Sequence, residues 1–268
     1  MIIKHKVISI FAILLFATAA CSPTKSSTPD NTGSSVEATL IPTQQNTKVP
    51  SVPISNNACT NPLYPVVVGA TWSYLISGPP ESNLVRSIQE LSSDGFTDQD
   101  EFSAGVTRTD TWKCQSGTLT ALDPSGNVLG TASVAAGGME TDFQTTNIDG
   151  VTLPAVVTEG TTWSQNITLE GVQTINDVEI ASTLTISNDC TGAGEELVTV
   201  TAGTFNARIV NCIGMVVITI NMSGMDIPIT TNSTSTTWYS EGVGMVKTIS
   251  DNSDGTKSSI ELIEYNIP

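Results

Sequence analysis

Histidine is almost absent from this chain, in which His5 is the only one among 268 residues. It lies near the start, in a segment that we expect to be removed as part of a signal peptide. A mature chain without imidazole excludes Ser-His-Asp and Cys-His catalysis. It also excludes zinc, copper or iron sites built on histidine ligands. Acid–base chemistry would then depend on carboxylates, lysine or tyrosine.

Basic residues are also scarce. The sequence has 10 Lys and Arg against 26 Asp and Glu, which gives a formal net charge of −16. A chain this acidic repels phosphate backbones, so we expect no nucleic-acid partner. It also repels anionic lipid surfaces, so any membrane attachment should come from a lipid rather than from charge. Beyond that, the acidity mainly indicates solubility.

The N-terminal segment lacks the length to cross a bilayer. The apolar run from Val7 to Ala20 has 14 residues and is interrupted by Ser9 and Thr18, whereas a spanning helix needs roughly 20. A basic start, a short apolar run and small residues at its end predict a signal peptide over residues 1–20.

The residues around Cys21 resemble the bacterial lipobox, in which small residues precede a cysteine. The resemblance of residues 18–21 (TAAC) implies that Cys21 receives a diacylglycerol and becomes the new N-terminus. The alternative is an ordinary signal peptidase site at residues 17–19, which would release an unanchored protein.

The segment that follows favours lipidation. Residues 21–58 are rich in Ser, Thr, Pro and Asn, and such a composition predicts a disordered tether. We therefore expect a protein anchored by lipid in the bacterial cell envelope and facing away from the cytoplasm.

Four cysteines remain after Cys21. An even number in an exported protein predicts two disulfides, with three possible connectivities. We favour Cys59–Cys114 and Cys190–Cys212, because each pair falls within one half of the remaining chain. The sequence contains no C-x-x-C spacing, so we expect no zinc cluster, and no other pattern calls for a metal or cofactor.

Residues 59–268 have the pattern of an all-β domain. Short runs rich in Val, Ile, Thr and Trp alternate with Gly-, Pro-, Asn- and Asp-containing turns, and no segment keeps a 3.6-residue apolar period. The runs lie at residues 71–76, 106–113, 161–169, 180–186, 207–211 and 245–250.

One phrase occurs twice in this domain. GATWS at residues 69–73 returns as GTTWS at residues 160–164, and Trp112 and Trp238 lie in later Thr-Trp stretches of the two halves. The echo favours a duplicated β-meander, although Thr and Trp are common in strands and chance is the alternative. The four Trp suit core packing, with sugar stacking as the functional alternative. The two repeats would be residues 59–150 and 151–268.

Three stretches resemble a family of exported bacterial lipoproteins that is mostly uncharacterised. They are residues 61–65 (NPLYP), 198–207 (VTVTAGTFNA) and 236–247 (TTWYSEGVGMVK). The resemblance implies an antiparallel sheet that is curved or forms an open half-barrel. Periplasmic carriers of lipoproteins and lipids have such a shape, and the likeness to them is one of fold alone.

The most apolar stretch of the mature chain is residues 213–222 (IGMVVITINM), in which both alternating sets of positions are apolar. Such a strand is covered on both faces or has one face on an apolar cavity. We therefore predict a ligand face at Ile218, Ile220, Met222 and Met225, since Met suits adaptable apolar surfaces. The alternative is a central strand of an ordinary core.

Acidic residues gather in residues 94–101 (DGFTDQDE) without the spacing of a calcium loop. We expect them to be solvated loop or edge-strand charges. Residues 59–268 also lack the G-x-S-x-G and S-x-x-K patterns of serine enzymes. It therefore predicts a non-catalytic β domain that binds an apolar small molecule or lipid. The alternatives are a structural or adhesion-type surface domain with a filled core and, third, a carboxylate-based hydrolase.

Overall fold

The computed structural model describes residues 58–78, 81–123, 141–175, 178–222 and 224–268. The predicted signal peptide, Cys21 and tether residues 21–57 lie outside the described residues. No helix in the described part of the chain has the length and apolar character to span a membrane.

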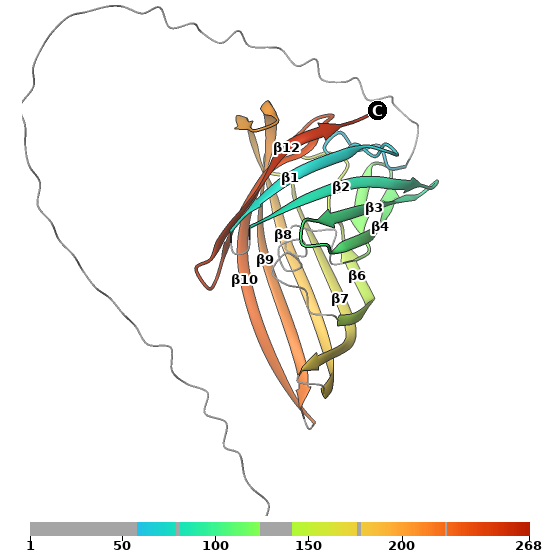
Figure 1. The fold of residues 1–268 in the computed structure, drawn as a ribbon, viewed down its shortest axis with the longest axis vertical. Coiled ribbons are helices and arrows are strands. Elements are labelled where there is room, and N and C mark those ends of the chain that lie inside the picture. The colour runs from blue at the N-terminus through green and yellow to red at the C-terminus, as the bar shows by residue number, and fades with distance from the viewer. Residues whose placement is uncertain (1–57, 79–80, 124–140, 176–177, 223) are drawn as a thin grey trace, which may run out of the picture. The chain divides into compact units, whose positions relative to one another are not determined.

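The described residues form twelve strands in one antiparallel sheet, drawn in Figure 1. Their bounds are β1 (Thr71–Ser77), β2 (Ser82–Leu91), β3 (Gly95–Phe102), β4 (Thr107–Gln115), β5 (Thr118–Ala121), β6 (Thr141–Gly150), β7 (Thr162–Ile175), β8 (Val178–Val200), β9 (Gly203–Met222), β10 (Met225–Ser240), β11 (Gly244–Asn252) and β12 (Lys257–Asn266). The all-β prediction is confirmed.

The sheet consists of two meanders joined at their first and last strands. Strands β1 to β5 pair in sequence order, as do β6 to β12, and β1 pairs with β12. The two outer strands, β5 and β6, are left at the edges. Near them, Leu119 and Leu153 form an antiparallel bridge, with backbone N–H···O distances of 2.8 and 3.0 Å. The sheet is therefore curved into a nearly closed, barrel-like form, as predicted for a curved antiparallel sheet.

The repeated motif, GATWS and GTTWS, is matched by a repeated pair of backbone hydrogen bonds. The N–H of Gly69 donates to the carbonyl of Ile88 at 3.0 Å, and the N–H of Ile88 returns to Ala70 at 3.0 Å. The same pair of bonds links the second phrase, at Gly160, to Gly192 at 2.9 and 2.8 Å. Both phrase glycines have φ near +80°, which glycine adopts without strain.

The Trp positions follow the same spacing. The first phrase leads into β1 and the second into β7, and the later Trp residues lie three strands further on, in β4 and β10. This local likeness agrees with the duplication hypothesis, and the repeats themselves stay a prediction.

The segment before β1 packs into one end of the sheet through Asn61. Its side-chain amide donates to the carbonyls of Gly117 at 2.8 Å and Pro154 at 3.1 Å, and its Oδ1 accepts the N–H of Leu63 at 2.9 Å. A buried Asn with these bonds fixes the backbone around it. The NPLYP stretch therefore holds the two meanders together through Asn61.

The other two family stretches meet this end of the sheet. The N–H of Gly242, in the β10–β11 turn, donates to the carbonyl of Pro62 at 2.8 Å. The indole of Trp72 donates to the carbonyl of Val243 at 2.6 Å. In the β8–β9 turn, the N–H of Ala202 donates to the carbonyl of Leu262 at 3.2 Å. Turn packing thus accounts for all three stretches without catalysis.

Two disulfides join the cysteines that the sequence pairs. Cys59 is bonded to Cys114, which ties the segment before β1 to β4. Cys190 is bonded to Cys212, which lies directly opposite it on the neighbouring strand.

We predict that the two disulfides differ in their contribution to stability. The Cys59–Cys114 bond closes a loop of 55 residues and the Cys190–Cys212 bond one of 22. Chain entropy then gives losses of about 4 and about 3 kcal/mol in the free energy of unfolding for the two double Cys→Ser variants. Unfolding in guanidinium chloride without reductant measures both losses of unfolding free energy. A larger loss for the Cys190–Cys212 variant than for the Cys59–Cys114 variant would contradict the prediction.

Candidate ligand site on the inner face of the sheet

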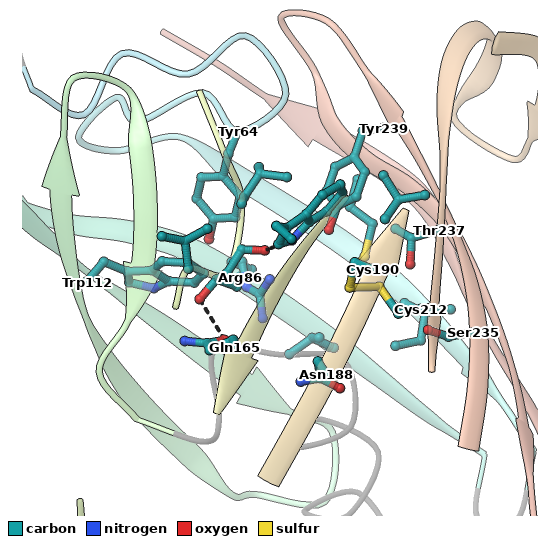
Figure 2. Close-up of a pocket in the computed structure, with 18 residues that line it drawn as sticks. Tyr64, Arg86, Trp112, Gln165, Asn188, Cys190, Cys212, Ser235, Thr237 and Tyr239 are labelled. Carbon is teal, nitrogen blue, oxygen red and sulfur yellow. Dashed lines mark hydrogen bonds between the residues drawn. A yellow bond between two sulfur atoms is a disulfide. The ribbon is translucent and has the colours of Figure 1, made fainter. Parts of the chain in front are cut away.

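A cavity of about 90 Å³ lies between the two meanders. Arg86 of β2 and Trp112 of β4 line one side, and Asn188 of β8, Cys212 of β9 and Tyr239 of β10 line the other, as Figure 2 shows. These side chains come from strands far apart in the sequence, so the cavity exists only once the sheet has curved.

A buried ladder of charges supports one wall of the cavity. Arg86, Asp100 and Arg108 are directly opposite one another on β2, β3 and β4. Arg86 donates to both carboxylate oxygens of Asp100, from Nε at 2.8 Å and from Nη2 at 2.7 Å. Arg108 Nη2 lies 3.3 Å from Asp100 and 3.5 Å from Asp110.

The expectation of solvated acids is therefore wrong for part of residues 94–101. The side chains of Asp98 and Asp100 are only 1 % exposed. They alternate along β3 and so share its inner face. The cross-strand arginines offset the cost of burying the carboxylates, and these partners were not apparent from the acidic stretch alone.

Asp98 is held by neutral donors as well as by charge. The hydroxyl of Tyr64 donates to its Oδ2 at 2.5 Å, the indole of Trp112 donates to its Oδ1 at 3.1 Å, and Arg86 lies 3.7 Å away. Burial raises the pKa of Asp98, against the opposing effect of Arg86. Burial, and then Asp98, also raise the pKa of Tyr64.

This cluster does not have the form of a hydrolase site. Asp98, Asp100 and Asp110 are each 1 % exposed, so a substrate does not reach their oxygens. Within the described ranges, no group of three or more Cys, Asp or Glu is placed to hold a metal ion.

An apolar face extends from the cavity along the long strands β7 to β10. Ile218 is opposite Leu184 on β8 and Ile229 on β10. Together they belong to an inward row that also includes Ile167, Leu169, Ile186, Val216, Ile220 and Ile227. We call these nine residues the inner apolar face.

The other side of the same strands is mostly polar, apart from Ile213, Met215 and Val217 on β9. Val217, next to Ile218, is opposite Thr185 on β8 and Thr230 on β10. Since alternate side chains point to opposite faces of a sheet, the sequence of these strands separates an isoleucine-rich side from a threonine-rich side.

Among the residues that the structure describes, the inner apolar face is covered at one end only. Ile167, Leu169 and Ile186 form a buried cluster. Towards the β9–β10 turn, by contrast, Ile227 is 42 % exposed and Ile229 is 50 % exposed. The sheet thus leaves part of an apolar surface open at its far end.

The predicted ligand residues lie on or beside this open part. Ile218 and Ile220 are partly buried on the inner apolar face. Met225 is 66 % exposed and is opposite Met222 at the end of the hairpin. Ile218, Ile220 and Met225 do not line the inner cavity. The structure therefore gathers them at one place, separate from the cavity that sequence reasoning missed.

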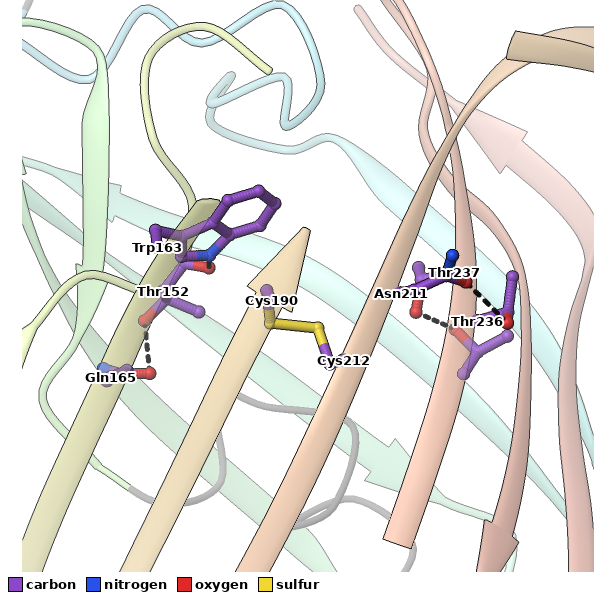
Figure 3. Close-up of a disulfide and its surroundings, with 9 residues drawn as sticks. Thr152, Trp163, Gln165, Cys190, Asn211, Cys212, Thr236 and Thr237 are labelled. Carbon is purple, nitrogen blue, oxygen red and sulfur yellow. Dashed lines mark hydrogen bonds between the residues drawn. A yellow bond between two sulfur atoms is a disulfide. The ribbon is translucent and has the colours of Figure 1, made fainter. Parts of the chain in front are cut away.

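The Cys190–Cys212 disulfide lies where the cavity borders the inner row, as Figure 3 shows. On one side of it, the hydroxyl of Thr152 donates to Gln165 Oε1 at 2.9 Å. On the other side, the hydroxyl of Thr236 donates to Asn211 Oδ1 at 2.9 Å. These bonds fix the strands around the disulfide.

We predict that Asp98→Asn becomes more stable relative to the unmodified protein as pH rises from 4 to 7. Since its pKa is raised in the fold, protonated Asp98 contributes stability at low pH. That contribution is lost as pH rises through the raised pKa. Asn stays neutral throughout. Urea unfolding at both pH values measures the difference.

The matched control for this prediction is Asp189→Asn, since Asp189 is exposed on β8. Its relative stability should change little between the two pH values. If Asp98→Asn instead loses relative stability between pH 4 and pH 7, the ion pair with Arg86 outweighs the burial of Asp98.

Comparison with solved structures gives three matches, including the following two. A candidate lipoprotein from Parabacteroides distasonis is 16 % identical, with 77 % of this chain and 99 % of the other covered and a TM-score of 0.55. A candidate exported protein with a YmcC-like fold from Bacteroides fragilis is 14 % identical, with 78 % and 100 % covered and a TM-score of 0.49. The first similarity shows a shared fold.

No curated protein matches the chain. A family model does match: that of the DUF3108-like family, over residues 106–263. The matched range extends from the start of β4 almost to the end of β12 and includes the inner apolar face. By this match, the chain belongs to the DUF3108-like family.

Proposed function

We propose that this protein is a lipid-anchored lipoprotein of the bacterial cell envelope whose β domain binds an apolar ligand, without catalysis, on the inner apolar face. The observation that carries the proposal is the open end of that face. Ile227 and Ile229 are each at least 42 % exposed, in line with Ile218 and Ile220 on the neighbouring strand. Contiguous exposed apolar surface in a folded protein marks an interaction site.

A ligand that covers the exposed isoleucines would gain free energy from the burial of apolar surface. Covering apolar surface contributes roughly 25 cal/mol per Å², or about 1.5–3 kcal/mol for a whole isoleucine side chain. Ile218, Ile220 and Ile229 are adjacent across β9 and β10, so one elongated apolar ligand contacts them together. The strands there are unusually long, with 20 residues in β9 and 16 in β10.

The proposed lipid anchor is supported by the sequence around Cys21 and by the similarity of fold. The family-like stretches, the lipobox-like residues 18–21 and the two disulfides agree with export. The structural neighbour from Parabacteroides distasonis is itself described as a candidate lipoprotein.

The alternative of a structural or adhesion-type surface domain predicts that a protein, rather than a small apolar molecule, covers the same isoleucines. The enzyme alternative has less support, because the buried acids are closed off from substrate.

We predict that Ile229→Asn weakens binding of the uncharged apolar dye N-phenyl-1-naphthylamine about 10-fold, because one apolar contact of about 1.4 kcal/mol is lost. Ile229 is half exposed, so the fold should tolerate the change. Fluorescence titration of the purified domain measures the affinity.

Ile213→Asn is the matched control, since Ile213 is 65 % exposed and is opposite Asp189 and Thr234 on the polar side of the sheet. Its affinity for the dye should be unchanged. Equal effects of the two variants, or no dye binding by the unmodified domain, would argue against the ligand face.

We predict that Cys21→Ser moves the protein from the membrane fraction to the soluble fraction when the full chain is expressed in a bacterium. A diacylglycerol anchors far more firmly than one acyl chain, so its loss should release nearly all of the protein. Mass spectrometry of the mature N-terminus is the second measurement. An unmodified mature chain that starts at Ala20 would exclude the lipid anchor.

A further inference from the structure

Three polar side chains reach the inner cavity without a hydrogen bond to any described residue. Asn188 comes from β8, and Ser235 and Tyr239 come from β10, as Figure 2 shows. All three are half-buried and line the cavity, so their polar atoms are available to a molecule that occupies it. An amide and two hydroxyls both donate and accept hydrogen bonds, so their natural complement is a group that does the same.

Among the described residues that line the cavity, Arg86 is the one cation, and its guanidinium is already bonded to a carboxylate. Arg86 lines the cavity, yet its Nε and Nη2 are bonded to Asp100. Arg86 and Arg108 stand against Asp98, Asp100 and Asp110, a formal excess of one negative charge. An anionic group beside Arg86 is therefore opposed by the acids behind it and by the net charge of −16.

A cationic group is disfavoured for a different reason. The three aspartates are 1 % exposed, so they are closed off behind the arginines. A ligand cation in the cavity would meet the guanidinium of Arg86 before any carboxylate. Desolvation of the half-buried Tyr239 raises its pKa to about 12, so its hydroxyl is neutral as well. The cavity thus suits an uncharged group.

The polar groups and the inner apolar face lie on the same strands. Asn188 precedes the cavity disulfide on β8, and Leu184 is four residues away, about 13 Å along the strand. Ser235 and Ile229 are six residues apart on β10, about 20 Å. Between the two places lies the row of Ile186, Val216 and Thr231. Ile186 is buried, whereas Val216 is half-buried and Thr231 is exposed, so a ligand that reaches both places passes Val216 and Thr231.

We propose that the ligand is an amphiphile with an uncharged, hydroxyl-bearing head, which binds in the cavity at Asn188, Ser235 and Tyr239, and an apolar tail on the inner apolar face. This inference rests on the proposed function. It adds the class of the ligand and separates it from fatty acids, phosphate-bearing lipids and cationic amphiphiles.

Three probes with the same twelve-carbon chain test the head group: 1-monolauroylglycerol, laurate and dodecyltrimethylammonium. Each displaces N-phenyl-1-naphthylamine from the purified domain at pH 8, below its micelle concentration. We expect monolauroylglycerol to compete at a concentration at least about 10-fold lower than either charged probe, the equivalent of about 1.4 kcal/mol. Equal competition, or preference for a charged probe, would overturn the inference.

Asn188→Leu removes the amide while keeping a side chain of similar size. We expect the advantage of monolauroylglycerol over the two charged probes to fall to about 2-fold. Asn166→Leu is the matched control, since Asn166 is opposite Ser187 on the other side of the sheet, and its selectivity should be that of the unmodified domain.

The outcomes separate the two proposals. Dye binding with no head-group selectivity, or selectivity that Asn188→Leu leaves intact, means that the cavity holds only water and that the inner apolar face acts alone. Absence of dye binding overturns the proposed function and, with it, the head-group inference.

Discussion

The buried ladder of Arg86, Asp100 and Arg108 constrains the first meander more than any other interaction. Charges removed from water are costly unless each is paired, and here the pairing runs across three strands in direct register. A slip of one residue in β3 would move its acids to the solvent face and leave both arginines buried without partners. The register of β2, β3 and β4 is thereby fixed. With it, the positions of Trp112 and of Tyr64 above Asp98 are fixed too.

Much of the fold could be predicted from local pattern. Alternation of Thr with Val, Ile and Trp predicts strands, and the placement of one cysteine pair in each half suggests the disulfides. The apolar stretch at residues 213–222 predicts an unusual strand, and Ile218 and Ile220 do lie on a partly open apolar face. Each of these signals is carried by residues close together in the chain.

The burial of the acids and the inner cavity could not be predicted from the sequence, because both depend on residues that lie far apart in the chain. The burial of Asp98 and Asp100 follows from arginines on two other strands, and nothing within residues 94–101 indicates them. The cavity needs Arg86 on β2 and Tyr239 on β10 to face each other. They do so only because the sheet curves until its edges approach at the bridge between Leu119 and Leu153. Alternation along β3 placed the two acids on one face, but it did not say which face was buried.

The pairing of β1 with β12 has a consequence for how the chain folds. The first strand, β1, pairs early with β2, but it meets its second neighbour, β12, only when the last strand has been synthesised. Contacts distant in sequence therefore contribute much of the fold, and such folds form slowly. For a chain that crosses a membrane before folding, as proposed here, the early meander would wait with an open strand edge. Open edges invite aggregation, so the early meander stays exposed to mispairing with other chains until the C-terminus arrives.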